Sequence, residues 1–277
     1  MFDETLRLLR EHGVRLNSKA GQQQVIDPTF LNRMIDYAKL SSKDTVLEVG
    51  AGAGNLTMLL ARYAGKVVAM ERDERLIKIL RKRLKNFSNV ELLQGDALLL
   101  EFPEFNKVVS NLPYSISSNI MFRLLEHKFE LAVLMFQREF AERLVARPGS
   151  HDYSRLTVNV HYCADVEILD EVPPTAFFPQ PMVTSVIVRL RPRDPPFKVV
   201  DKNVFSNVVR SLFQHKRQRV RNALMRSFGE VFPNSSLPKA KRRSLIDEKI
   251  PKELSETRVM NLAPEKFGEI ANLLTSP

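Results

Sequence analysis

The chain has 277 residues, of which 27% are charged and 44% hydrophobic, a globular composition that excludes disordered and fibrous architectures. Lysine and arginine outnumber aspartate and glutamate by ten. The excess lies in one region, because residues 1–185 hold 23 basic and 23 acidic side chains, whereas residues 186–277 hold 19 and 9. This division is typical of a neutral domain joined to one that faces a polyanion, although a solvated basic surface gives the same count.

Few candidate metal ligands or membrane segments are present. Cys163 is the single cysteine, which excludes an intramolecular disulfide and a thiolate zinc site, and the five histidines form no pair at metal-ligand spacing. The longest apolar run, residues 131–136, is too short to span a bilayer, and residues 1–12 do not resemble a signal peptide. We therefore expect a monomeric, cytoplasmic protein that holds no metal.

Short β-rich runs alternate with longer helical ones along the first part of the chain. In chain order, the pattern predicts a strand at 45–49, a helix at 55–63, a strand at 66–70, a helix at 74–85, strands at 89–93 and 107–110, a helix at 117–126 and a strand at 131–136. This alternation is typical of an α/β fold with a parallel sheet and right-handed crossovers. We expect a helix from Glu139 and then mixed helix and strand to residue 172. A strand at 182–190 is expected to close the sheet as part of an antiparallel edge pair.

A domain boundary is predicted after residue 190. Residues 191–196 contain three prolines, cannot hold a regular element and are typical of a linker. Beyond them, apolar residues at helical spacing predict helices at 203–213, 217–228, 239–247 and 264–274. We therefore expect two domains, an α/β domain at residues 1–190 and a small all-helical domain at residues 191–277.

The end of the first predicted strand carries a cluster of glycines. Gly50, Gly52 and Gly54 let the chain turn tightly and let a ligand approach the backbone, and the following helix N-terminus offers free N–H groups. Glu71 ends the second strand, where its carboxylate can accept hydrogen bonds from a ribose. The glycine cluster together with Glu71 is typical of a dinucleotide site and equally of an S-adenosylmethionine (SAM) site. Asn55 occupies the place of the third glycine of the dinucleotide fingerprint, which favours SAM, and a glycine-rich turn without a ligand is the alternative.

Asp96 follows the third strand within Gly95-Asp96-Ala97. At the carboxyl edge of the sheet its side chain could accept a hydrogen bond from an adenine amino group. An aspartate that caps a turn or a helix is the alternative interpretation.

Asn111, Leu112, Pro113 and Tyr114 follow the fourth strand and form the most specific motif of the chain. The exocyclic amino group of a base is a poor nucleophile, so a site that methylates it needs acceptors that hold the amino hydrogens. The side-chain carbonyl of Asn111 and the main-chain carbonyl of Leu112 can supply them, and Pro113 fixes the turn. Tyr114 offers a flat face for an extruded base. A plain turn with a core tyrosine is the alternative.

In this order and spacing, the three motifs resemble those of the adenine-N6 dimethyltransferases of ribosomal RNA, which comprise KsgA-type small-subunit enzymes and Erm-type relatives. The resemblance continues through residues 153–158, 172–183, 213–217 and 221–224 and covers roughly residues 17–226. It implies a Rossmann-like SAM-dependent methyltransferase sheet with a small C-terminal helical domain.

The resemblance also implies roles for individual residues. Cofactor contacts are implied for Gln22, Gly50, Gly52, Glu71, Asp96 and Asn111. Catalytic contacts with the target adenine are implied for Asn111, Leu112, Pro113, Tyr114 and Phe177, with Tyr114 and Phe177 flanking the base. One segment departs from the family pattern Gly-Gln-Asn/His-Phe-Leu, because Gln23 replaces Asn or His and Gln24 replaces an aromatic or apolar residue.

The implied reaction is a direct in-line methyl transfer from SAM to adenine N6, which leaves S-adenosylhomocysteine and needs neither metal nor nucleophilic triad. Dimethylation of adenines in small-subunit ribosomal RNA, within ribosome biogenesis, is therefore the leading interpretation. Erm-like methylation of large-subunit RNA and an assembly or RNA-binding factor without catalysis are the alternatives. A DNA adenine methylase would more often carry Asp or Asn before Pro-Pro-Tyr.

The basic excess is densest between residues 202 and 229, which hold seven basic side chains and no acidic one. Lys216, Arg217, Arg219 and Arg221 fall within about one and a half predicted helical turns, mostly too densely to be paired internally. We predict that these four side chains contact phosphates of folded RNA. A solvated charged face is the alternative.

Overall fold

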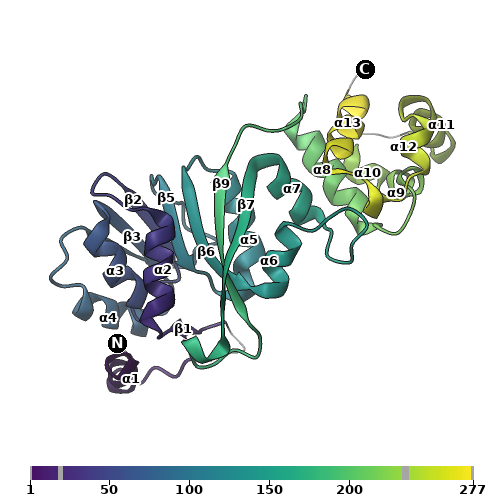
Figure 1. Ribbon diagram of the computed structural model, residues 1–277. Coiled ribbons are helices and arrows are strands. Elements are labelled where there is room, and N and C mark those ends of the chain that lie inside the picture. Colours follow the sequence, from purple (N-terminus) through teal and green to yellow (C-terminus); the bar gives the residue numbers. More distant parts are fainter. Residues whose placement is uncertain (1, 18–20, 233–236, 276–277) are drawn as a thin grey trace. The chain divides into compact units, whose positions relative to one another are not determined.

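The computed structural model describes residues 2–17, 21–232 and 237–275 (Figure 1). Contacts divide the chain into two compact units. The first unit comprises residues 1–141 and 165–192, and the second comprises residues 142–164 and 193–277. Within the described residues, no helix combines the length and apolar character needed to cross a bilayer.

The first unit is built on a seven-stranded sheet with the strand order β4-β3-β2-β5-β6-β9-β7. Its strands are β2 (Thr45–Val49), β3 (Lys66–Glu71), β4 (Val90–Gln94), β5 (Lys107–Asn111), β6 (Leu131–Gln137), β7 (Ala164–Val172) and β9 (Ser185–Pro192). Strands β2 to β6 are parallel, and β9 is antiparallel to β6. The predicted parallel sheet is therefore confirmed.

The sheet ends in the expected pair of strands. Strand β9 is antiparallel to β6, and β7 lies beyond it at the edge. Strand β7 falls in the stretch for which the sequence predicts only mixed structure. Its residues alternate between charged and apolar without a continuous buried face, which is a weak local signal for a strand.

Both faces of the sheet are covered at its centre. Successive side chains of a strand point to opposite faces, and every residue from Leu131 to Phe136 of β6 is buried. The helices of this part of the chain are α1 (Phe2–Glu11), α2 (Pro28–Ala38), α3 (Asn55–Tyr63), α4 (Glu74–Arg83), α5 (Ser117–Leu125) and α6 (Arg138–Leu144). With both faces buried, the carboxyl ends of the parallel strands are where loops can form a site.

A second, two-stranded sheet lies beside that edge. Strand β1 (Gln24–Val25) pairs antiparallel with β8 (Phe177–Phe178), with Gln24 opposite Phe178 and Val25 opposite Phe177. This pair joins the N-terminal segment that precedes α2 to the segment that leads into β9. Two regions that are more than 150 residues apart in the sequence are therefore joined by backbone hydrogen bonds.

The second unit is helical. Its elements are α7 (Arg155–Cys163), α8 (Lys202–Gln214), α9 (Val220–Arg226), α10 (Phe228–Val231), α11 (Lys239–Lys249), α12 (Lys252–Glu256) and α13 (Pro264–Thr275). The unit differs from the predicted division at residue 190, because α7 belongs to it. The reason is packing: the ring of Tyr162 in α7 lies 5.0 Å from that of Phe205 in α8, within one buried cluster.

Candidate active site

The glycine-rich loop after β2 brings two motifs into contact. Gly50 has φ 81°, and a Cβ placed there would lie 3.0 Å from ring atoms of Pro113. Gly52 has φ 59°, and a Cβ there would collide with the side-chain amide of Gln24 at 2.2 Å. Both positions therefore require glycine, because the loop turns with positive φ while other residues pack directly on its backbone.

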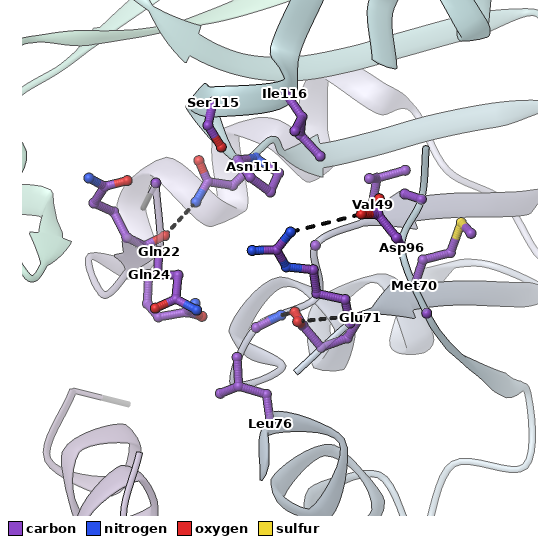
Figure 2. Close-up of a pocket in the computed structure, with 18 residues that line it drawn as sticks. Gln22, Gln24, Val49, Met70, Glu71, Leu76, Asp96, Asn111, Ser115 and Ile116 are labelled. Atoms are coloured by element: carbon purple, nitrogen blue, oxygen red, sulfur yellow. Dashed lines mark hydrogen bonds and ion pairs between the residues drawn. The ribbon is translucent and has the colours of Figure 1, made fainter. Parts of the chain in front are cut away.

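A cavity opens at the carboxyl ends of β2, β3, β4 and β5, with about 690 Å³ of space between atoms, its open mouth included. All six residues for which the resemblance implies a cofactor contact line it: Gln22, Gly50, Gly52, Glu71, Asp96 and Asn111. Figure 2 shows Glu71, Asp96 and Asn111 around this one cavity although they come from different strand ends. The size and the mixed lining suit a nucleoside-sized ligand.

Glu71 is held in place by the backbone. Its Oε2 accepts a hydrogen bond from the Gly52 N–H (2.9 Å), and its Oε1 accepts from the N–H groups of Arg72 (2.8 Å) and Asp73 (2.9 Å). A carboxylate offers about four acceptor positions, so one remains for a ligand hydroxyl. The position and bonding of Glu71 are therefore compatible with binding a ribose hydroxyl.

Asp96 holds its own turn and still faces the cavity. Its Oδ1 accepts a hydrogen bond from the Leu98 N–H at 2.9 Å, as the capping interpretation expects. Its Oδ2 makes a long contact of 3.9 Å with Arg72 Nη1. Arg72 also lines the cavity, and sequence reasoning missed it. Only its position directly after Glu71 could have indicated it.

Gln22 lines the cavity with part of its hydrogen-bonding capacity already used. Its Oε1 accepts a hydrogen bond from the Asn17 N–H at 3.1 Å, and its own N–H donates to the Asn17 carbonyl at 3.1 Å. Only its Nε2 group is left to donate to a ligand.

Asn111 carries the most informative polar group of the site. Its Nδ2 donates to the main-chain carbonyl of Gln23 at 3.0 Å, which fixes the orientation of the amide. Its Oδ1 is buried and has no hydrogen-bond partner within the described residues. An unpaired buried carbonyl is costly, so it requires a reason, and a ligand that donates a hydrogen bond supplies one.

Glu48 lies behind this site, and sequence reasoning gave it no role. Together with Asn55 and Asn111 it lines a second, smaller cavity, and its side chain is almost fully buried. Burial raises the pKa of Glu48 to about 8, and the nearby charge of Glu71 acts in the same direction. Glu48 is therefore mostly a neutral carboxylic acid at neutral pH.

Tyr114 is anchored at its hydroxyl. This group forms a 2.5 Å hydrogen bond with the Ser185 hydroxyl at the start of β9, and burial raises the pKa of Tyr114 to about 12, so the ring is neutral and fixed. Leu112 and Phe177 are each 1% exposed and do not line the cavity. The structure thus brings Asn111 and Pro113 to the cavity but buries Phe177, whose contact with the target base stays a prediction.

The basic cluster of the second unit differs from its predicted form. Lys216 and Arg217 lie in a turn, and Arg219 forms an isolated antiparallel bridge with Arg258. Helix α9 begins only at Val220, because backbone hydrogen bonds join this segment to residues 257–260. The expectation of mostly unpaired charges is wrong for two of the four residues. Ion pairs join Arg219 to Glu256, and Arg221 to Glu256 and, at 3.5 Å, to Asp247. Within the described ranges, Arg217 makes no ion pair and is exposed.

The strand order, the glycine-rich loop and the cavity at the carboxyl edge define a Rossmann-like SAM-dependent methyltransferase sheet. The model of a family described as "Ribosomal RNA adenine dimethylase" matches residues 13–273. The chain belongs to this family.

Individual relatives agree with this assignment. A protein of Methanothermobacter thermautotrophicus named "Probable ribosomal RNA small subunit methyltransferase A" is 47% identical over 98% of this chain and 95% of its own length. A protein of the same name from Thermococcus onnurineus is 44% identical over 98% and 96%. The crystal structure of a dimethyladenosine transferase from Plasmodium falciparum has a TM-score of 0.72 at 32% identity, covering 88% of this chain and 94% of that one. That of 23S rRNA methyltransferase ErmE has a TM-score of 0.64 at 29% identity, covering 91% and 99%.

Proposed function

We propose that the protein dimethylates the N6 amino group of adenines in small-subunit ribosomal RNA, with SAM as the methyl donor. The observation that carries this proposal is the buried Oδ1 of Asn111 at the cofactor cavity, which has no hydrogen-bond partner in the described part of the chain. An amino group that is to be methylated presents the hydrogen that this oxygen lacks. The names of relatives that are 38–47% identical favour the small subunit over an Erm-like substrate. The proposed setting is the cytoplasm, with the protein acting as a monomer.

The cavity residues fit the parts of SAM. Glu71 has an acceptor position left for ribose, and Asp96 Oδ2 faces the cavity, where it can accept from the adenine amino group. The backbone at Gly50 and Gly52 also lines the cavity and is proposed to lie along the methionine portion. When bound, SAM supplies an electrophilic methyl group on its sulfonium. No metal is proposed.

The chain's own contribution to the reaction is position. Asn111 Oδ1 and the main-chain carbonyl of Leu112 are proposed to accept the two amino hydrogens of the target adenine, which turns the nitrogen lone pair toward the donor. The bond from Asn111 Nδ2 to Gln23 holds this acceptor in place before the substrate arrives. Such preorganisation is the main resource of an enzyme whose leaving group is already good.

The target base is proposed to leave its RNA stack and rest on Tyr114, with Phe177 on its other side. The Tyr114–Ser185 hydrogen bond keeps the ring in one orientation, which lowers the entropy cost of stacking. Dimethylation adds one requirement, because the pocket must accept an amine that already carries one methyl group.

RNA phosphates are proposed to bind the basic cluster of the second unit. Arg217, and Lys216 beside it, are the strongest candidates, because Arg219 and Arg221 are already paired with acidic side chains. These contacts would set register rather than read sequence.

The test is transfer of radiolabelled methyl groups from SAM to unmethylated small subunits, to large subunits and to protein-free RNA. We expect label in the small subunits as N6,N6-dimethyladenine. Label in the large subunits alone would support the Erm-like alternative. Binding of SAM without label in any of the three would refute the enzymatic function, and full activity of Asn111→Ala would refute the proposed amine acceptor.

A further inference from the structure

Asn55, the first residue of α3, connects three separate parts of the chain. Its side chain is buried, with 3% exposed. Its Oδ1 accepts hydrogen bonds from the Thr5 hydroxyl in α1 (2.9 Å) and from Arg83 Nη1 in α4 (2.8 Å). Its Nδ2 donates to the main-chain carbonyl of Val25 in β1 at 2.9 Å. Two donors on one side and a carbonyl on the other fix the orientation of the amide.

Arg83 is the stronger of the two groups that orient this amide. Its side chain is 3% exposed, and besides Asn55 it donates to the carbonyl of Ala53 at 2.6 Å and pairs with Glu4 at 3.2 Å. A cation near a helix N-terminus opposes the helix dipole, so these acceptors are what stabilise it there. Because Arg83 Nη1 binds Asn55 Oδ1 by itself, the amide keeps its orientation even without Thr5.

The segment that Asn55 holds is an arm formed by residues 21–25. Four of its residues, 21–24, line the cofactor cavity. The arm is bound at three successive positions: Asn111 Nδ2 donates to the Gln23 carbonyl, the Ala53 N–H donates to Gln24 Oε1 at 2.9 Å, and Asn55 donates to Val25. The third of these bonds joins α3, the helix that follows the glycine-rich loop, to β1, the strand that pairs with β8.

We infer that Asn55 is a positioning residue that keeps the 21–25 arm closed over the cofactor cavity. The inference rests on the proposed function only in taking SAM and S-adenosylhomocysteine as the ligands. An amide is required at this position, because it presents a donor and an acceptor on one short, planar group. Aspartate keeps the acceptor for Arg83 and Thr5 but places an oxygen against the Val25 carbonyl, which repels it and favours an open arm.

Asn55→Asp is therefore the decisive variant, and Thr5→Val is its matched control. Thr5→Val also removes one buried hydrogen bond of Asn55 but leaves the bond to Val25 intact. For Asn55→Asp we expect S-adenosylhomocysteine to bind about tenfold more weakly in titration calorimetry, the factor that one buried hydrogen bond is worth. The KM for SAM should rise by a similar factor, with kcat at saturating SAM changed less than about threefold. Thr5→Val should lower the melting temperature yet bind S-adenosylhomocysteine within about twofold of the wild type.

The outcomes separate this inference from the proposed function. A wild-type protein that binds no S-adenosylhomocysteine would contradict the proposed function itself. If the wild type binds it and both variants bind equally well, Asn55 is only structural and the inference is wrong. A fall in kcat with unchanged KM and unchanged affinity would also overturn it, since the arm lines the cofactor cavity. Should Asn55→Asp fold poorly, Asn55→Ala, measured well below its melting temperature, must show the same loss of affinity.

Discussion

Glu48 is buried behind the glycine-rich loop, and its titration should make the protein less stable as the pH rises above neutral. Burial raises its pKa from the ordinary value of 4.5 to about 8, and the charge of Glu71 adds to the effect. The folded state therefore holds a proton that the unfolded chain has already lost at neutral pH. The contribution of this group to stability is fully present below pH 4.5 and is lost as the pH rises through 8.

The size of the effect between pH 7 and pH 9 follows from linkage. Over this interval the unfolded chain carries no proton on Glu48, while the folded protein goes from mostly protonated to mostly ionised. The free energy of unfolding should fall by about 1.4 kcal/mol, because the folded protein holds on average half a proton on Glu48 over these two pH units, and one pH unit of full proton linkage is worth that amount. For a protein of this size that is a loss of roughly 2–4 °C in melting temperature.

Glu48→Gln isolates the contribution of Glu48 titration to stability, because glutamine has nearly the same shape as glutamate but does not titrate. Melting curves of both proteins at pH 7, 8 and 9 and constant ionic strength should show the decline in the wild type and remove most of it in the variant. Cys163, whose pKa is also raised by burial, titrates equally in both proteins and cancels in the comparison. Parallel declines in the two proteins would show that Glu48 is already ionised at neutral pH and refute the reasoning.

Three further predictions follow from single contacts. Ser185→Ala and Tyr114→Phe remove the same hydrogen bond, so each should lower kcat/KM for RNA by about fivefold, and a double variant much worse than either would contradict a shared role. Arg217→Ala should weaken RNA binding and reduce the slope of log K against log salt concentration by about 1. Arg219→Ala should change this slope less, because the charge of Arg219 is already paired with Glu256. Equal slopes for the two variants would contradict this distinction. Burial alone would raise the pKa of Asp44, but hydrogen bonds from neighbouring asparagine, lysine and serine groups hold that pKa below its ordinary value. Asp44→Asn should therefore lower the free energy of unfolding by about 3 kcal/mol at pH 7 in denaturant titrations, and by less in acid, where the wild-type carboxylate is protonated. A difference that does not change with pH would contradict this role of the carboxylate.

The elements that the sequence predicts well are those with a strong local pattern. Helix α3 spans Asn55–Tyr63 and strand β2 spans Thr45–Val49, as their periodicity and the glycines between them predict. The uninterrupted apolar run of β6 likewise marks a strand buried on both faces. In these segments propensity, periodicity and burial point to the same structure, so local reasoning suffices.

Elements whose state depends on distant partners were predicted less well. Helix α9 starts three residues later than expected because the segment before it bonds to residues 257–260. Arg219 and Arg221 appear free in the sequence, but their acidic partners lie 26–37 residues away and come close only through the helical packing. Sequence spacing detects only the ion pairs formed within one helix.

The sequence by itself determined the division of charge, the parallel strands β2 to β6 with the helices between them, and six of the residues that line the cofactor cavity, because parallel strands bring their carboxyl ends to one edge. Only the tertiary structure decided which of those groups are buried, charged and already bonded. Glu48 is mostly neutral at neutral pH, and Asn111 Oδ1 has no partner among the residues that the structure describes. Phe177 is buried, and Asn55 binds the 21–25 arm to the start of α3. Each of these properties depends on desolvation and on partners far apart in the chain, which no local pattern records. The basic excess noted from composition is divided in the same way, since tertiary contacts pair Arg219 with Glu256, whereas Arg217 forms no ion pair among the described residues.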